Sequence, residues 1–167
     1  MKLFCLVVLF VVVEGAVKFE NCHNNPHVHL KVDHFPDVLH IKKGHNFKAK
    51  FGVTFSKELA QPLHAKITLE KKVAFIWVTI PCINKLGSCE YELTCDELKR
   101  LAGVDKLPYP CPAPIGTISN EVNVLIPEVP SIVQKIGTGS YNFKVELSDH
   151  KRNRIACVQV KGLPVNF

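Results

Sequence analysis

The sequence lacks the short motifs that identify most enzymes. It contains no G-x-S-x-G nucleophile elbow, no H-E-x-x-H zinc-protease motif and no glycine-rich phosphate-binding loop. Its 167 residues suit one domain, since domains average roughly 150 residues, and a hydrophobic content of 47% excludes a disordered chain. We therefore expect a single globular domain that is not an enzyme, has no catalytic residues and binds no cofactor.

No hydrophobic run is long enough to cross a membrane. The longest run, Leu3–Val13, follows Lys2 and is shorter than the roughly 20 residues that a spanning helix needs. A charged start, a short apolar run and small residues up to Gly15 are typical of a secretory leader. We predict a signal peptide over residues 1–15 and a soluble mature domain over residues 16–167. Its expected location is extracellular, or the lysosomal or endosomal lumen.

Cysteine never occurs in the C-x-x-C spacing of zinc sites. An even number of cysteines in a secreted chain indicates disulfides, and six cysteines allow 15 connectivities. Short loops close most easily, which favours Cys82 with Cys89 and Cys95 with Cys111. The remaining pair would then join the two ends of the domain. The six cysteines of the predicted mature domain are Cys22, Cys82, Cys89, Cys95, Cys111 and Cys157.

Apolar residues recur at every second position, which is typical of half-buried strands. The clearest alternations run from Phe47 to Phe55 and from Tyr141 to Leu147. One helix is expected near residues 95–103, because Thr94 and Glu97 form a capping box. The pattern predicts an all-β, immunoglobulin-like sandwich or cup of two antiparallel sheets. Further strands are expected near residues 28–32, 64–69, 73–80, 118–126 and 155–160.

The sequence is rich in phenylalanine, with ten Phe against one Trp and three Tyr, and several of these rings fall at inward positions of the alternating strands. These aromatic faces could pack into a solid core, which the alternation alone favours, or separate to line a cavity for acyl chains. The residues that would form the cavity wall are Phe47, Phe51, Phe55, Trp77, Tyr141 and Phe143.

The segment from Ile126 to Gly139 is too apolar for an ordinary surface loop. It could pack onto the core, or it could form a lip of the cavity that dips into a bilayer. We predict the second arrangement, with Ile132, Val133 and Ile136 as the lipid-contacting residues.

Several short motifs follow one another along the chain: W-V-T-I-P-C from Trp77, L-G-S-C-E-Y from Leu86, C-D-E-L from Cys95, C-P from Cys111 and T-G-S-Y from Thr138. Their order and spacing resemble the ML lipid-recognition family over residues 18–163. The resemblance implies a sandwich or cup with a hydrophobic lipid cavity, and it implies the three disulfides named above, with Cys22 paired to Cys157.

Members of this family bind or transfer lipids without catalysis. The resemblance therefore implies a lipid ligand, either a glycolipid or a phospholipid, and a lysosomal glycosidase as the partner of an activator. The alternatives within the family are a sterol carrier and a recognition module for lipid A. A hydrolase and a histidine-rich metal-binding protein are the alternatives outside it.

The net charge of +6 favours an anionic partner. The basic residues are scattered in short pairs such as Lys42-Lys43, Lys71-Lys72 and Lys151-Arg152, which we interpret as solvated strand ends. No nucleic-acid-binding motif accompanies them. We expect an anionic membrane surface as the partner, no nucleic acid, and a monomer or weak dimer.

Seven of the eight histidines fall between His23 and His64. His27 and His29 would share one face of a strand, a spacing that can bind a transition metal weakly. No carboxylate or cysteine completes a recognisable site, so we predict solvated histidines and no metal. Below pH about 6 their protonation would add positive charge and strengthen attraction to anionic membranes.

Overall fold

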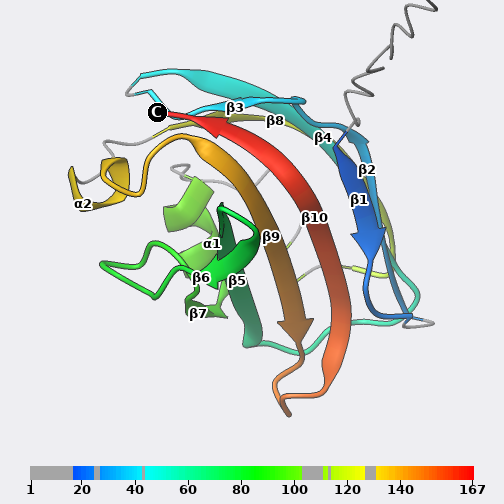
Figure 1. Cartoon of the computed structure of the whole chain (residues 1–167). Coiled ribbons are helices and arrows are strands. Elements are labelled where there is room, and N and C mark those ends of the chain that lie inside the picture. The colour runs from blue at the N-terminus through cyan, green and yellow to red at the C-terminus, as the bar shows by residue number, and fades with distance from the viewer. Residues whose placement is uncertain (1–16, 25–26, 43, 103–110, 113, 127–130) are drawn as a thin grey trace, which may run out of the picture.

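The computed structural model describes residues 17–24, 27–42, 44–102, 111–112, 114–126 and 131–167 (Figure 1). The predicted signal peptide falls on residues 1–15 and lies outside this part of the chain. Within the described residues, no helix has the length and apolar character needed to cross a membrane.

In the described part of the chain the fold is mostly β with two sheets, as the alternation predicted, and it includes the expected short helix α1 and a one-turn helix α2 (Figure 1). The larger sheet has the order β1-β10-β9-β5-β6, with β3 added to β10 and β7 added to β5, and the smaller sheet has the order β2-β4-β8. Between the strands that the structure describes, all pairings are antiparallel except the short β3–β10 pairing. The elements are β1 Lys18–Asn21, β2 Val28–His34, β3 Leu39–His40, β4 Asn46–Phe55, β5 Leu63–Val73, β6 Ile76–Thr79, β7 Glu90–Leu93, α1 Cys95–Ala102, β8 Gly116–Leu125, α2 Ser131–Gln134, β9 Gly139–Ser148 and β10 Arg154–Asn166.

Three of the expected strands differ clearly in extent from the structure. The strand predicted over residues 64–69 is longer, since β5 runs from Leu63 to Val73. The strand predicted over residues 73–80 is a hairpin, in which β5 ends at Val73, the chain turns, and β6 begins at Ile76. The strand predicted to end at Val160 continues to Asn166, because a register shift between Val160 and Leu163 lets it pass Gly162.

Two apolar clusters form the core at opposite ends of the sheets. At one end, Val28, Phe55, Leu59 and Ile155 are all buried and join the small sheet to β10. At the other end, the buried residues Ile80, Tyr141, Val160, Leu163 and Val165 belong mainly to the large sheet. The first cluster therefore closes one end of the sandwich with residues of both sheets.

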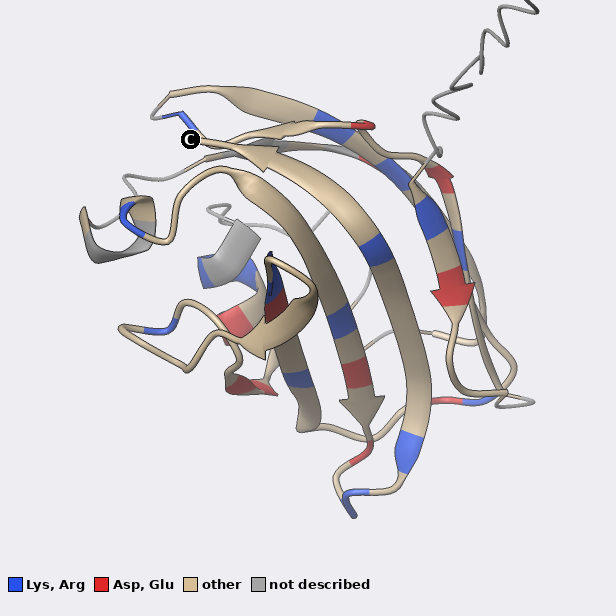
Figure 2. Ribbon diagram, in the orientation of Figure 1, with Lys and Arg blue, Asp and Glu red and all other residues tan. Residues whose placement is uncertain are grey.

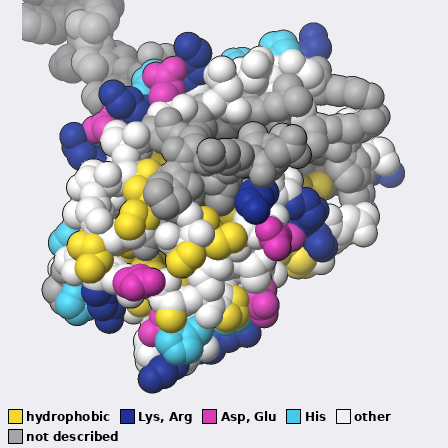
Figure 3. Space-filling view, turned by 180° about the vertical axis from the view of Figure 1, so that it is seen from behind, with side chains coloured by type: hydrophobic (Ala, Val, Ile, Leu, Met, Phe, Trp, Pro, Cys, Tyr) yellow, Lys and Arg dark blue, Asp and Glu magenta, His cyan; other side chains and the backbone are white. Residues whose placement is uncertain are grey.

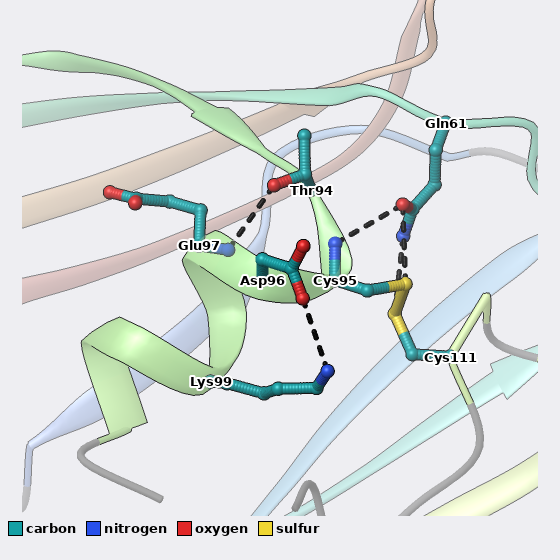
Figure 4. The surroundings of a disulfide bond; sticks show 7 residues. All are labelled: Gln61, Thr94, Cys95, Asp96, Glu97, Lys99 and Cys111. Atoms are coloured by element: carbon teal, nitrogen blue, oxygen red, sulfur yellow. Dashed lines mark hydrogen bonds and ion pairs between the residues drawn. A yellow bond between two sulfur atoms is a disulfide. The ribbon is translucent and has the colours of Figure 1, made fainter. Parts of the chain in front are cut away.

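Helix α1 begins where the sequence predicted. The Thr94 hydroxyl accepts a hydrogen bond from the Glu97 backbone N–H at 3.2 Å, which is the N-cap interaction (Figure 4). The amide group of Gln61 fixes the helix start, because its oxygen accepts from the Cys95 N–H at 3.2 Å and its nitrogen donates to Cys111 Sγ. The predicted stop at Gly103 lies outside the described residues.

Replacement of Thr94 by alanine is expected to lower the free energy of unfolding by about 1 kcal/mol, because it removes the N-cap acceptor. Urea unfolding monitored by circular dichroism measures this change. Thr94→Ser keeps the hydroxyl and is the matched control, so an equal loss in both variants would show that the cap is not the cause.

The structure contains the three expected disulfides: Cys22–Cys157, Cys82–Cys89 and Cys95–Cys111. The first joins the segment after β1 to β10, where the Cys22 N–H also donates to the Cys157 carbonyl at 3.0 Å. The second closes the loop that follows β6, and the third ties α1 to the segment before β8. The pairing thus follows the loop-length argument.

Candidate functional site

The inner face of the small sheet is formed by the odd-numbered residues of β4. Phe55 belongs to the cluster that closes one end, and Ala49 is buried as well. Phe47 and Phe51 are only half-buried. Phe47 contacts the ring of Phe35 edge-to-face, with centroids 5.6 Å apart. The alternation therefore placed these phenylalanines on one face, and the two nearer the start of β4 keep some exposed surface.

The inner face of the large sheet is formed by the odd-numbered residues of β5 and β9. Tyr141 is 3% exposed, and burial raises the pKa of its phenol. Its hydroxyl donates to the carbonyl of Gly137. Phe143 packs against the same cluster but stays half-buried. Among the described residues no large side chain is less than 2% exposed.

Trp77 is the one expected wall residue that does not share this face. In the β5–β6 pairing it stands opposite Lys72, and directly opposed residues of an antiparallel pair lie on the same face of the sheet. That face is the outer one, because Lys71, the neighbour of Lys72, stands opposite the inward Tyr141. The structure thus groups Phe47, Phe51 and Phe55 on one inner face and Tyr141 and Phe143 on the other, without Trp77.

The tip of the β5–β6 hairpin is apolar and exposed. Phe75 is 96% exposed and Ile76 is 64% exposed. Val73, Trp77 and Val78 are also exposed. This surface was missed in the sequence because the run from Val73 to Val78 contains no glycine, proline or asparagine to signal a turn. Exposed apolar surface that is contiguous marks a contact with a membrane, a ligand or another protein.

The segment predicted to form a lip of the cavity is described only in part. Its one-turn helix α2 runs from Ser131 to Gln134 beside the start of β9 (Figure 1). The side chains of Ile132 and Val133 lie outside the described set. Ile136 is half-buried and packs against the cluster around Tyr141. The predicted membrane insertion of this segment stays a prediction.

Lys71 anchors the end of this segment to β5. Its ammonium group donates to the carbonyl of Ile136 and, at 3.2 Å, to the carbonyl of Gly137. It also lies 5.8 Å from the centroid of the Tyr141 ring. The interpretation of the Lys71-Lys72 pair as solvated is therefore wrong for Lys71, which is half-buried, and right for Lys72, which is exposed.

A polar cavity of about 280 Å³ lies on the outer face of the large sheet. Glu146, only 8% exposed, lies among its lining residues and pairs with Arg154 at 2.7 Å and Lys144 at 3.1 Å. His64 and Arg152 also line it. Because its charges are largely paired and its walls are polar, this cavity does not suit an acyl chain.

The histidines do not gather into a site. The back view shows them in separate places on that face (Figure 3). In the part of the chain that the structure describes, no group of three or more His, Cys, Asp or Glu side chains is placed to hold a metal ion. His27 instead lies 3.0 Å from the Ser56 hydroxyl.

Comparison with known proteins identifies the family. A family model described as the ML domain matches residues 16–162. The chain belongs to the ML domain family. The ganglioside GM2 activator of Mus musculus is 30% identical over 159 residues, covering 87% of this chain and 80% of that protein. The Macaca fascicularis activator is 29% identical over 158 residues, covering 87% and 82% respectively. The chain is therefore an ML-domain lipid-recognition protein related to the ganglioside GM2 activator.

Two solved structures of low sequence identity also align with most of this ML domain. A Niemann-Pick type C2 protein from Japanese carpenter ant aligns with a TM-score of 0.48 and 14% identity, covering 89% of this chain and 99% of that chain. Chicken MD-1 complexed with lipid IVa aligns with a TM-score of 0.43 and 20% identity, covering 87% and 88%. The three disulfides and the relationship to the activator are consistent with a secreted or lumenal protein.

Proposed function

We propose that this ML domain binds an amphipathic lipid between its two sheets, extracts it from an anionic membrane surface, and transfers or presents it. The observation that carries the proposal is the partial exposure of inward-facing phenylalanines on both sheets. Phe51 of β4 and Phe143 of β9 face the interior, yet both remain only half-buried. A closed sandwich would bury such residues, because protein interiors are close-packed.

The sandwich is closed at one end and bears exposed apolar residues at the other, which suits a protein that takes up an acyl chain from one side. One end is sealed by Val28, Phe55, Leu59 and Ile155. The other end bears the exposed apolar hairpin tip around Phe75. An acyl chain entering beside the tip would meet the half-buried phenylalanines and stop at the sealed end. The hairpin tip would enter the bilayer during extraction, together with the segment that contains Ile132 and Val133.

The relationship to the ganglioside GM2 activators supports a glycolipid or phospholipid as the ligand and an auxiliary role without catalysis. It also supports a lysosomal glycosidase as the partner that receives the presented lipid. The proposed mature protein spans residues 16–167 after a leader of residues 1–15, works in the extracellular space or the lysosomal or endosomal lumen, and is a monomer or weak dimer.

Charge would add to the attraction between the protein and an anionic membrane. The chain carries a net charge of +6, and its Lys and Arg residues are spread along both sheets (Figure 2). Each basic residue near an anionic surface contributes about 1 kcal/mol at moderate ionic strength.

Native mass spectrometry of the purified protein, followed by lipid extraction, tests the proposal. We expect one bound lipid per chain, which the protein moves between vesicles in proportion to its concentration. Turnover of a lipid ester by the protein alone would contradict the proposal, because a carrier acts stoichiometrically.

The double variant Phe51→Ala with Phe143→Ala is expected to weaken binding of a palmitoyl lipid about tenfold, because it removes apolar contact from both inner faces. The binding constant from displacement of a fluorescent lipid measures the effect. Lys50→Ala alters the outer face of β4 next to Phe51, and its binding should equal that of the unmodified chain. If the double variant bound as tightly as that control, the two phenylalanines would not line the site.

A further inference from the structure

We propose that Lys71 is a binding residue for the anionic group of the lipid, so that the protein prefers amphiphiles with a phosphate, sulfate or carboxylate next to the chain. This inference rests on the proposed function and names a ligand chemistry and a residue that determines it. It starts from the position of Lys71 on the sheet.

Lys71 occupies an inward position among apolar residues. Along β5 the residues on its face are Leu63, Ala65, Ile67, Leu69 and Val73. Among the inward register positions of β4, β5, β6 and β9, as the structure describes them, Lys71 is the one charged residue. It stands opposite Tyr141 of β9 and Val78 of β6. A lone cation on an apolar face is costly unless something compensates it.

The protein compensates this cation only in part. Two of the three ammonium donors are directed at the carbonyls of Ile136 and Gly137. A carbonyl accepts a hydrogen bond but does not neutralise a charge. In the described part of the chain, no carboxylate pairs with Lys71. The third donor and the net positive charge thus remain available to an anion.

The backbone leaves room for the ammonium group. A Cβ atom at Gly139 would lie 3.0 Å from Lys71 Cε, and one at Gly137 would lie 3.6 Å from its Nζ. The tight contact is the one at Gly139, so glycine there lets the lysine side chain lie against the start of β9. The ring of Tyr141 on the neighbouring strand β9 attracts the same cation.

The order of residues along β5 matches the order of headgroup and acyl chain in an amphiphile. Along β5, Val73 and the exposed tip lie on the solvent side of Lys71. Leu69 lies on its other side, toward the interior, in the cluster with Tyr141 and Ile80. An acyl chain that reaches down between the sheets would leave its headgroup near the level of Lys71. A charge-assisted hydrogen bond at that level is worth about tenfold or more in affinity.

Matched amphiphiles test the proposal on the full chain. Dodecyl phosphate and dodecyl maltoside carry the same chain, and below their micelle concentrations they present no charged surface. Calorimetry should show tighter binding of dodecyl phosphate by the unmodified protein. Lys71→Met should weaken dodecyl phosphate about tenfold and leave dodecyl maltoside within twofold, whereas Lys71→Arg should keep the preference. Lys72→Met removes the same charge from the outer face and should change neither affinity.

Several outcomes would overturn the proposal. If Lys71→Met kept the full preference for dodecyl phosphate, Lys71 would not bind the anionic group, although the proposed function would stand. If inorganic phosphate alone bound as tightly as dodecyl phosphate, the residue would serve a free-anion site. Binding of neither amphiphile by the unmodified chain would contradict the proposed function and the role of Lys71 with it.

A measurement on the unmodified chain covers the case in which Lys71→Met does not fold. Acetylation of individual lysines, followed by mass spectrometry, reports how accessible each ammonium group is. Dodecyl phosphate should slow acetylation of Lys71 at least threefold more than dodecyl maltoside does, and it should not slow that of Lys72. Equal protection of Lys71 by both amphiphiles would contradict the proposed contact.

Discussion

Replacement of Cys22 and Cys157 by serine is expected to lower the free energy of unfolding by about 5 kcal/mol, because that disulfide closes the longest loop in the chain. The two cysteines are 135 residues apart in sequence. The bridge therefore removes more conformational freedom from the unfolded chain than either of the others. Since small domains are stable by only about 5–15 kcal/mol, this variant should be close to unfolding at 37 °C.

The Cys82–Cys89 bridge provides the matched control for this prediction. Its cysteines are 7 residues apart, so the same loop-closure argument gives a loss of about 2.5 kcal/mol for the double serine variant. Urea unfolding of the two variants side by side measures both values. Equal losses in the two variants would show that the length of the closed loop does not determine how much each disulfide stabilises the protein.

The long strands could be predicted from the sequence because their two faces differ. In β4 and β9 apolar and polar residues alternate over ten residues, and both strands begin and end within one or two residues of the expected bounds. Strands β1, β3 and β7 were missed, since they have two to four residues each. Alternation over so few residues cannot be distinguished from chance, and these strands depend on pairing with longer neighbours.

The turn of the β5–β6 hairpin could not be predicted because no turn residue marks it. Ala74 adopts a φ of 53°, a left-handed conformation that glycine or asparagine usually provides. The apolar run through the turn therefore resembled one continuous strand. The turn changes two features of the candidate site. Trp77 lies on the outer face with Lys72 instead of on the cavity wall, and the residues around Phe75 form an exposed tip that the sequence did not reveal.

The role of Lys71 was hidden for a different reason. The expected strand over residues 64–69 ended before it, so Lys71 was treated as one of a pair at a solvated strand end. The alternation in fact continues from Leu63 to Val73 and places Lys71 on the face of Leu69. A charged residue at an inward, apolar position of a strand indicates a candidate binding residue. This position can be recognised only when the full length of the strand is known.

The hairpin tip should decide whether the protein can extract lipid from a membrane. Phe75 is 96% exposed and Ile76 is 64% exposed. Their transfer from water into a bilayer interface would contribute roughly 3 kcal/mol, which is on the order of a hundredfold in membrane affinity. The side chains have few contacts to lose within the protein, so substitutions at the tip should leave the fold unchanged.

We therefore expect Phe75→Asp with Ile76→Asp to reduce extraction from anionic vesicles on the order of a hundredfold. Binding of a short-chain monomeric lipid should stay within twofold, because the inner faces are untouched. Ile115→Asp is the matched control: Ile115 is 66% exposed and directly precedes β8 at the sealed end, where Gly116 pairs with Phe55. A vesicle extraction assay with all three proteins measures the difference. Equal extraction by the tip variant and the Ile115 variant would show that lipid enters the protein by another route.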